Sequence, residues 1–267
     1  MTSVAWSDEG IGPAVVLLHA FPLDHRMWDG QVPDLVDAGW RVLVPDLPGF
    51  GASELPDTAP SLAVVADTLI ASLLDRGIDR CVVVGLSVGG YLAMEWLRRR
   101  PEMVAGVVLC DTKATPDSDA ARRVRLAMAD EIDRDPSLTS QILRERVMPK
   151  LVGETTTRLR PEVVSTVEEW IDQAPAATVS WFQRAMAARP DSVPTLREAM
   201  LPVVIVWGQE DVLSTDSDQS AMLEALTDGR LVAIPTAGHL SAVEDPEPVT
   251  RAIAEFLSSV RGANLDG

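Results

Sequence analysis

A serine at the centre of a short glycine-rich segment could act as a nucleophile. The segment GLSVG, centred on Ser87, matches the pattern G-x-S-x-G and lies between an apolar run at 81–84 and a helical pattern at 88–100. A sharp strand-to-helix turn lifts such a hydroxyl clear of the sheet, and small neighbours keep the turn free of clashes. The alternative is a turn that only joins strand to helix. The placement between the two favours the nucleophile.

A serine hydroxyl needs a base, and the chain has three histidines. His239 is the only one after the Ser87 turn, and it stands in a loop between the last predicted strand and the last predicted helix. Loops at the carboxyl ends of strands commonly carry catalytic groups. We therefore predict His239 as the base. We expect His19 to hold its adjoining loop in shape and His25 to lie in solvent.

The base in turn needs a carboxylate that orients it. Asp211, in the segment WGQEDVLS, follows the apolar run at 203–207. The order serine, aspartate, histidine is also the order that this strand–turn–helix context uses. Glu210 and Asp111 are alternatives, because Glu210 is adjacent and Asp111 ends another apolar run. We favour Asp211.

Two backbone amides could stabilise the negative oxygen that forms when the serine attacks a carbonyl. The amide of Val88 stands at a helix N-terminus, where the helix dipole favours negative charge. The second donor should come from the loop after the first parallel strand. We predict the amide of Phe21 there, because Pro22 has no N–H.

Bulky apolar residues in the predicted loops and in the helical insert could select the substrate. Tryptophans at helical positions more often pack in a core than recognise a ligand, so packing is the alternative interpretation. The candidate pocket residues are Trp28, Trp181, Phe182, Leu213 and Leu240.

Apolar runs alternate with helical patterns over the first half of the chain and again after residue 200. This order predicts an α/β fold, with a mostly parallel central sheet and helices on both faces. Between the two halves the pattern is helical only and is interrupted by prolines. We predict a core formed by 1–111 and 201–267, with a helical cap at 112–200.

The composition narrows the classes of ligand. A formal net charge of −17 repels nucleic acids and anionic membranes, and a strongly anionic substrate would need a local basic patch. Neither a secretion signal nor an apolar run long enough to span a membrane stands out. We therefore expect a soluble cytoplasmic protein without nucleic-acid or membrane partners. A homodimer is compatible with the sequence.

Scattered histidines and two separated cysteines, Cys81 and Cys110, predict no metal site, and each cysteine resembles a buried small hydrophobe. A dinucleotide fingerprint is also missing, because serine stands where G-x-G-x-x-G needs its second glycine. We expect no cofactor.

The segments LLHAFP, DLPGFGAS, GLSVGG, WGQEDVLS and AGHLSAVEDP, in this order, resemble the α/β-hydrolase fold superfamily, and within it small esterases and enol-lactonases. The resemblance covers nearly the whole chain and is weakest at 112–200. Such relatives usually have a β-hairpin before the first parallel strand, but only about thirteen residues precede it here, so the resemblance implies a single antiparallel strand around residues 4–6. It implies a serine hydrolase that cleaves a small carboxylic ester or lactone through an acyl-enzyme. Relatives with the same triad include carbon–carbon bond hydrolases, perhydrolases, acyltransferases and non-catalytic small-ligand receptors, which stay open as alternatives.

Overall fold

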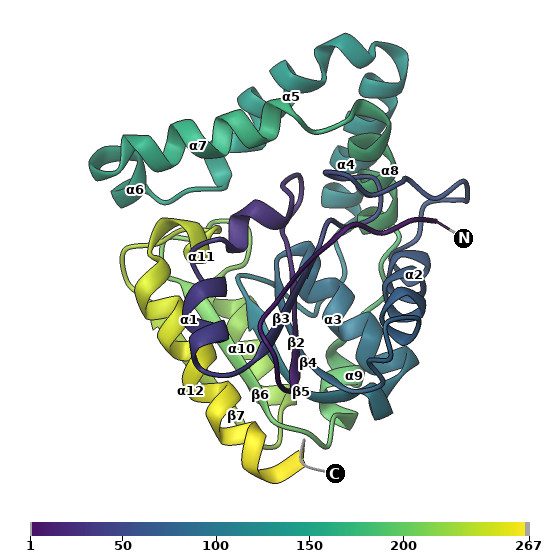
Figure 1. Ribbon diagram of the computed structural model, residues 1–267. Coiled ribbons are helices and arrows are strands. Elements are labelled where there is room, and N and C mark those ends of the chain that lie inside the picture. The colour runs from purple at the N-terminus through teal and green to yellow at the C-terminus, as the bar shows by residue number, and fades with distance from the viewer. Residues whose placement is uncertain (1, 265–267) are drawn as a thin grey trace.

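Seven strands form one sheet at the centre of the computed structural model, which describes residues 2–264 (Figure 1). Their order across the sheet is β1-β3-β2-β4-β5-β6-β7, and all neighbours are parallel except β1, which is antiparallel to β3. The expected N-terminal strand is present, but it begins at Trp6 rather than around residue 4. The strands are β1 Trp6–Glu9, β2 Ala14–Leu18, β3 Arg41–Pro45, β4 Cys81–Leu86, β5 Val104–Cys110, β6 Val203–Gly208 and β7 Gly229–Ile234.

The central strands are apolar because helices cover both of their faces. Every residue of β2, β4, β5 and β6 is buried, which explains their continuous apolar runs. The register pairs Leu18 with Gly85, and Cys110 with both Leu86 and Val206. The carboxyl ends of these strands therefore meet at one edge of the sheet, and the segments that follow them are neighbours.

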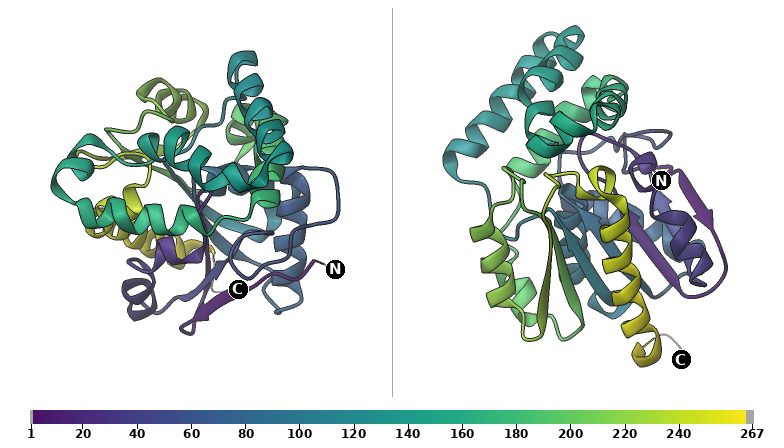
Figure 2. Two further views of the ribbon diagram at one scale, coloured as in Figure 1. Left: turned by 90° about the horizontal axis from the view of Figure 1, so that it is seen from above. Right: turned by 90° about the vertical axis from the view of Figure 1, so that its left-hand side faces the viewer.

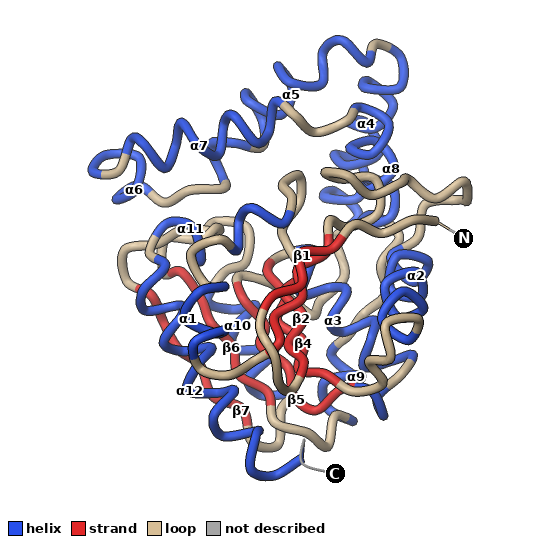
Figure 3. The backbone as a smooth tube through the Cα atoms, in the orientation of Figure 1, coloured by secondary structure: helices blue, strands red, loops and turns tan. Residues whose placement is uncertain are grey.

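Two groups of helices flank the sheet (Figures 2 and 3). The helices α1 and α12 pack together on one face, where α12 contacts β5, β6 and β7. On the other face α3 contacts β4 and β5 and packs against α2 and α9, and α9 packs against α10. These helices are α1 Val32–Asp37, α2 Leu62–Leu74, α3 Val88–Arg99, α9 Val193–Glu198, α10 Asp216–Ala225 and α12 Pro246–Asn264.

Five helices between β5 and β6 lie over the carboxyl ends of the strands, at the top of Figure 1. The first and last of them, α4 and α8, pack side by side, and Arg184 of α8 pairs with Asp130 and Asp133 of α4. The range predicted as a cap also contains α9, which packs against the core instead. The five are α4 Asp119–Arg134, α5 Thr139–Arg146, α6 Glu154–Leu159, α7 Pro161–Asp172 and α8 Ala176–Ala187.

Several short helical elements connect the longer ones. None of the described helices combines the length and the apolar character needed to cross a membrane. Cys81 and Cys110 are buried free thiols in neighbouring strands, as expected for small apolar residues. The short elements are η1 His25–Trp28, η2 Pro101–Met103, η3 Pro136–Leu138, η4 Met148–Lys150 and α11 Ser241–Glu244.

Candidate active site

Ser87 stands on a tight turn between β4 and α3. Its φ of 56° and ψ of −111° place it in the left-handed half of conformational space, which residues with a side chain rarely adopt. The flanking glycines make this turn compatible with its neighbours. A Cβ atom on Gly85 would lie 2.2 Å from the carbonyl oxygen of Gly89, and one on Gly89 would lie 2.2 Å from that of Leu18. The G-x-S-x-G pattern therefore has a steric cause in this fold.

Ser87, His239 and Asp211 form one continuous chain of hydrogen bonds. The distance from His239 Nε2 to Ser87 Oγ is 2.8 Å, and the distance from His239 Nδ1 to Asp211 Oδ2 is also 2.8 Å. A neutral imidazole that donates from Nδ1 to the carboxylate has an acceptor at Nε2. The serine hydroxyl can then donate to Nε2, which is the arrangement that a general base requires.

The loop after β6 holds Asp211 in place. Asp211 Oδ1 accepts hydrogen bonds from the amides of Leu213 at 2.7 Å and Ser214 at 3.2 Å, and the Ser214 hydroxyl donates to Oδ2. Burial acts to raise the pKa of Asp211, but the His239 ring and these donors lower it more. The pKa of the carboxyl therefore lies below its ordinary value, and the group is ionised at neutral pH.

The charge of Asp211 also changes the proton affinity of the base. Burial acts to lower the pKa of His239, whereas the negative charge of Asp211 and the hydrogen bond to it act to raise the pKa. The second effect is larger, so the pKa of His239 lies above its ordinary value. Glu244 fixes the backbone on both sides of His239, because its Oε1 accepts from the amides of Gly238 at 2.9 Å and Leu240 at 3.1 Å.

The two alternative carboxylates, Asp111 and Glu210, form hydrogen bonds with groups other than the His239 ring. Asp111 accepts from the amide of Gly208 at 2.7 Å and from the amide of Ser241 at 3.2 Å, so it links the two loops that carry Asp211 and His239. Glu210 accepts from the amide of Thr155 at 2.8 Å and points toward α6. Of the three candidates, the structure places only Asp211 within hydrogen-bond distance of His239.

One predicted oxyanion donor follows Ser87 directly in the chain, and the other belongs to a residue of the same cavity wall. Phe21 lines the same cavity as Ser87 and His239, and Val88 is the first residue of α3. Among residues 2–264, neither the Phe21 amide nor the Val88 amide has a hydrogen-bond acceptor. Unpaired N–H groups at a helix start and in an adjoining loop are the arrangement that an oxyanion hole needs.

His19 fixes the loop that carries Phe21, as expected. Its Nε2 accepts from the amide of Leu47 at 2.8 Å, and its Nδ1 therefore donates to the carbonyl of Ala20 at 2.9 Å. The side chain is fully buried, and burial lowers the pKa of His19 to about 4. The ring stays neutral and joins two loops at the mouth of the site.

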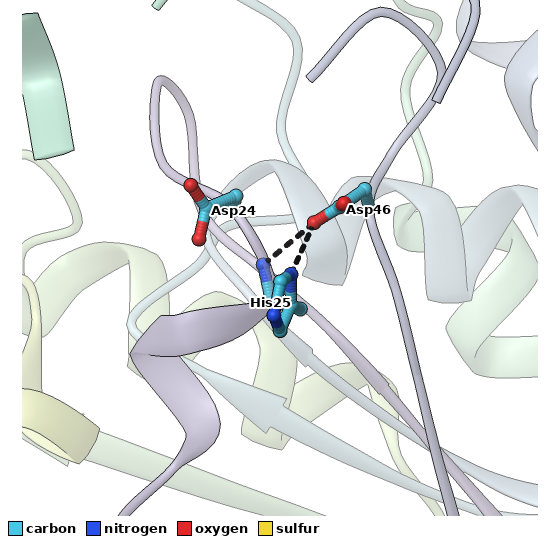
Figure 4. A group of neighbouring side chains, drawn as sticks. All are labelled: Asp24, His25 and Asp46. Carbon is cyan, nitrogen blue, oxygen red and sulfur yellow. Dashed lines mark hydrogen bonds and ion pairs between the residues drawn. The ribbon is translucent and has the colours of Figure 1, made fainter. Parts of the chain in front are cut away.

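Asp24, His25 and Asp46 form a second cluster (Figure 4), although the sequence predicts no grouping of metal ligands. One ligand atom from each lies within 4.8 Å of the others, and His25 bonds Asp46 at 2.6 Å instead of lying wholly in solvent. The guanidinium of Arg26 occupies both oxygens of Asp24, at 2.8 and 2.6 Å. With these partners already in place, the cluster ties the Phe21 loop to the loop after β3.

A cavity of about 340 Å³ opens beside Ser87 and His239, between the sheet and the helices above it. Leu213 lines it, as the sequence predicts, but Trp28, Trp181, Phe182 and Leu240 do not. These four are buried in the packed interior: the Trp181 indole donates to the carbonyl of Thr58 at 3.0 Å, and Phe182 packs against Phe50. Apolar periodicity marks a buried face, and it does not distinguish a core from a cavity wall.

The cavity wall also contains residues that the sequence reading missed. On α8 the neighbouring face provides Gln183 and Met186, which are three residues apart. The wall carries four basic side chains and one acidic side chain, in a chain with an excess of acidic residues. One signal was available in the sequence: the chain contains only two lysines, and both are in this wall. The basic and acidic members are Lys113, Arg125, Arg146, Lys150 and Asp117.

Comparisons with known proteins agree with this architecture. The family model described as the alpha/beta hydrolase fold matches residues 13–246. The structure of a thermophilic esterase from Thermogutta terrifontis, with malate bound, superposes with a TM-score of 0.92 at 37% identity, over 97% of this chain and 94% of that chain. An enol-lactonase from Burkholderia xenovorans has the same fold, with a TM-score of 0.87 at 23% identity, over 96% of this chain and 97% of that one.

One relative is similar to this chain in sequence over most of its length. The pimeloyl-(acyl-carrier protein) methyl ester esterase of Aromatoleum aromaticum is 30% identical over 247 residues, which are 88% of this chain and 94% of that protein. The residues that the family model matches, 13–246, include the Ser87 turn, Asp211 and His239, and the superposition on the Thermogutta esterase covers 97% of the chain. The chain belongs to the α/β-hydrolase family of enzymes.

Proposed function

We propose that this chain is a serine hydrolase that cleaves a small carboxylic ester or lactone through an acyl-enzyme intermediate. The observation that carries the proposal is the hydrogen-bond chain from Ser87 through His239 to Asp211, which begins at the floor of a cavity. The two relatives described as esterases, at 37% and 30% identity, support an ester as the bond that is cleaved.

In the first half of the reaction, Ser87 Oγ attacks the carbonyl carbon of the ester, and His239 Nε2 takes the hydroxyl proton. Asp211 stays ionised and stabilises the imidazolium that forms. The amides of Phe21 and Val88 receive the negative oxygen of the tetrahedral intermediate, each worth about 3 kcal/mol in the transition state. His239 then protonates the departing alkoxide, and the alcohol leaves with the acyl group bound to Ser87.

In the second half, water enters the same cavity and His239 takes one of its protons. The hydroxide attacks the acyl carbon, the second tetrahedral intermediate uses the same two amides, and Ser87 Oγ leaves with the proton from His239. The products are one carboxylic acid and one alcohol, and a lactone yields both on a single molecule. The enzyme returns to its starting protonation state.

The helices from α4 to α8 act as a cap in this proposal. Seven of their residues line the cavity, among them Met128, Gln183 and Met186, so the acyl or alcohol group of the substrate contacts the cap. We propose the cap as the unit that selects the substrate and that partly excludes water, which strengthens the electrostatic contacts below it.

The experiment that tests the proposal compares Ser87→Ala with the wild-type chain on p-nitrophenyl acetate. We expect the variant to lose at least about a thousandfold in kcat/KM, because the nucleophile is gone and only binding and the oxyanion amides are left. A fluorophosphonate probe should label the wild type and not the variant. Mass spectrometry of the peptide should place the label on Ser87.

The matched control is Ser165→Ala, because Ser165 is an exposed serine of α7 outside the cavity. This variant should keep wild-type turnover and labelling. Ser87→Ala protein that is folded and still hydrolyses the ester at the wild-type rate would refute the proposal.

A further inference from the structure

Both lysines of the chain line the cavity beside Ser87. Lys113 and Lys150 are the only lysines in the sequence, where 23 basic residues stand against 40 acidic ones. Basic side chains are outnumbered by acidic ones in this chain, and the overall charge of −17 repels anions from most of its surface. The concentration of its lysines at one cavity therefore needs a local explanation.

The arginines of the cavity wall already have carboxylate partners. Arg125 Nε pairs with Asp117 Oδ2 at 2.6 Å, and Arg146 Nη1 pairs with Glu131 at 2.6 Å. Asp117 Oδ1 also receives Arg189 at 2.7 Å, and the Arg189 guanidinium lies 4.3 Å from the centre of the Tyr91 ring. Two arginines share one buried carboxylate, so the group formed by Arg125, Asp117 and Arg189 carries a net positive charge, although only Arg125 and Asp117 of it line the cavity.

The lysines have no such partner. Within residues 2–264, no carboxylate lies within ion-pair distance of Lys113 or Lys150. The one hydrogen bond of the Lys113 ammonium goes to the carbonyl of Leu213, at 3.3 Å. An ammonium group has three donors, so Lys113 keeps two for another acceptor.

Lys113 lines the same cavity as Ser87 and His239. Lys113 follows β5 by three residues and is half-buried, and its contact Leu213 belongs to the loop whose amide donates to Asp211. Lys150 ends η4 on the cap side of the same cavity and is exposed. The substrate space is thus flanked by an ammonium on the core side and by another on the cap side.

We propose that the substrate carries a carboxylate as well as the ester that is cleaved, and that Lys113 and Lys150 bind this carboxylate while Ser87 attacks the ester carbonyl. The substrate class is a half-ester or lactone of an acid that keeps one free carboxylate. This inference rests on the proposed serine-hydrolase function. A substrate carboxylate supplies the anionic partner that neither ammonium group has among residues 2–264, and it is drawn to the cavity by the local positive potential.

The test compares an anionic ester with a neutral one of about the same length. Mono-p-nitrophenyl adipate carries a free carboxylate, and p-nitrophenyl heptanoate carries an ethyl group in its place. The measured quantity is the ratio of their kcat/KM values, in wild type, Lys113→Met, Lys150→Met and Lys113→Arg. A second pair, 4-acetoxybenzoate and 4-methylphenyl acetate, places the carboxylate on the leaving group.

We expect Lys113→Met to lower the anionic-to-neutral ratio of one of the two pairs by roughly tenfold or more, because it removes a charge-assisted hydrogen bond. Lys150→Met should lower the same ratio by roughly threefold, since the exposed ammonium is screened by solvent. Lys113→Arg, which keeps the charge, should retain most of the ratio. High salt should reduce the wild-type ratio and should have little effect on that of Lys113→Met.

The matched control is Arg122→Met, which removes one positive charge from the exposed face of α4, outside the cavity wall. It should leave both ratios unchanged. Equal ratios in wild type and in both lysine variants, for both substrate pairs, would overturn the carboxylate site while the Ser87-dependent hydrolysis of heptanoate stands. If Ser87→Ala also keeps the heptanoate activity, the serine-hydrolase proposal itself fails.

Discussion

The carboxyl group of Asp111 accepts a hydrogen bond from the backbone amide of Gly208 at 2.7 Å. Its other oxygen accepts from the amide and the hydroxyl of Ser241. Gly208 precedes Asp211 by three residues, and Ser241 follows His239 by two. Asp111 therefore fixes the spacing between the orienting carboxylate and the base without touching either, which makes it a positioning residue.

Burial raises the pKa of Asp111 from 3.8 to about 8, with the charge of Asp211 as the second cause, so the group is protonated in the folded chain at neutral pH. Asn has nearly the same shape and no charge. Its Oδ1 can accept from the Gly208 amide and its Nδ2 can donate to the Ser241 hydroxyl, so only the bond from the Ser241 amide is lost. We expect Asp111→Asn to keep kcat within a few-fold of wild type at pH 7. Asp111→Ala leaves buried donors unpaired and should cost about 1–3 kcal/mol of stability, measured by urea unfolding.

The same pKa shift predicts how stability depends on pH. Between about pH 4 and about pH 8 the unfolded chain releases the Asp111 proton and the folded chain keeps it, so this group makes the wild type less stable as pH rises. Asn does not titrate. The free energy of unfolding of Asp111→Asn, relative to wild type, should therefore rise from pH 5 to pH 8. Parallel curves for the two proteins would contradict a neutral Asp111.

The pKa of His239 predicts how activity falls at low pH. The reaction needs the neutral ring, and Asp211 raises the pKa of His239 above its ordinary value of 6.5 despite the opposing effect of burial. We expect kcat/KM for p-nitrophenyl acetate to fall as pH drops through a midpoint above 6.5. In Asp211→Asn the midpoint should move to lower pH, and the plateau should fall by up to about 10⁴ because the ring loses its orienting partner.

Asp228→Asn serves as the control for that experiment, because Asp228 is an exposed acid before β7 and no hydrogen bond or ion pair of the described chain involves its side chain. Its profile should overlay the wild type. An unchanged midpoint in Asp211→Asn would show that the carboxylate does not set the proton affinity of the base.

Much of this site is predictable from the sequence because its parts are local. Short segments of the sequence determine each of these parts: the turn around Ser87, the strand ends before Asp211 and His239, and the alternation of strands and helices. The choice of the Phe21 amide as an oxyanion donor, which stays a prediction, rests on the same local logic, since Pro22 has no N–H to donate. Parallel strands with a common edge then bring together side chains that are 152 residues apart in sequence.

The cavity wall is less predictable, because it depends on how amphipathic helices pack. Trp181 and Gln183 both lie on buried faces of α8, but only Gln183 faces the cavity. The contacts among Asp24, His25 and Asp46 also require two loops to meet, and no sequence spacing encodes that. The two lysines are the exception, because their rarity is visible in the sequence even though their common location is not.

Gly89, in the turn that carries Ser87, has no room for a side chain. A Cβ on Gly89 would lie 2.2 Å from the carbonyl oxygen of Leu18, which is backbone and cannot rotate away. We expect Gly89→Ala to lower the free energy of unfolding by about 1–3 kcal/mol and to displace Ser87, so that activity falls further than stability accounts for. Gly30→Ala is the control, since its only near neighbour is the Pro246 side chain at 3.3 Å. Equal unfolding curves for the two variants would contradict the close approach.

Met186 and Trp181 belong to the same helix, α8, but Met186 lines the cavity and Trp181 packs in the core. Met186 lines the cavity, whereas the Trp181 ring packs on Phe182 and donates to the Thr58 carbonyl. Met186→Ala should widen the cavity and shift the kcat/KM optimum of p-nitrophenyl esters toward longer acyl chains. Trp181→Ala should instead lower the free energy of unfolding by about 3–5 kcal/mol, with an unchanged order of chain-length preference in the protein that folds. A preference that changes in Trp181→Ala and not in Met186→Ala would reverse this assignment, and it would return Trp181 to the role that its position in the sequence first suggested.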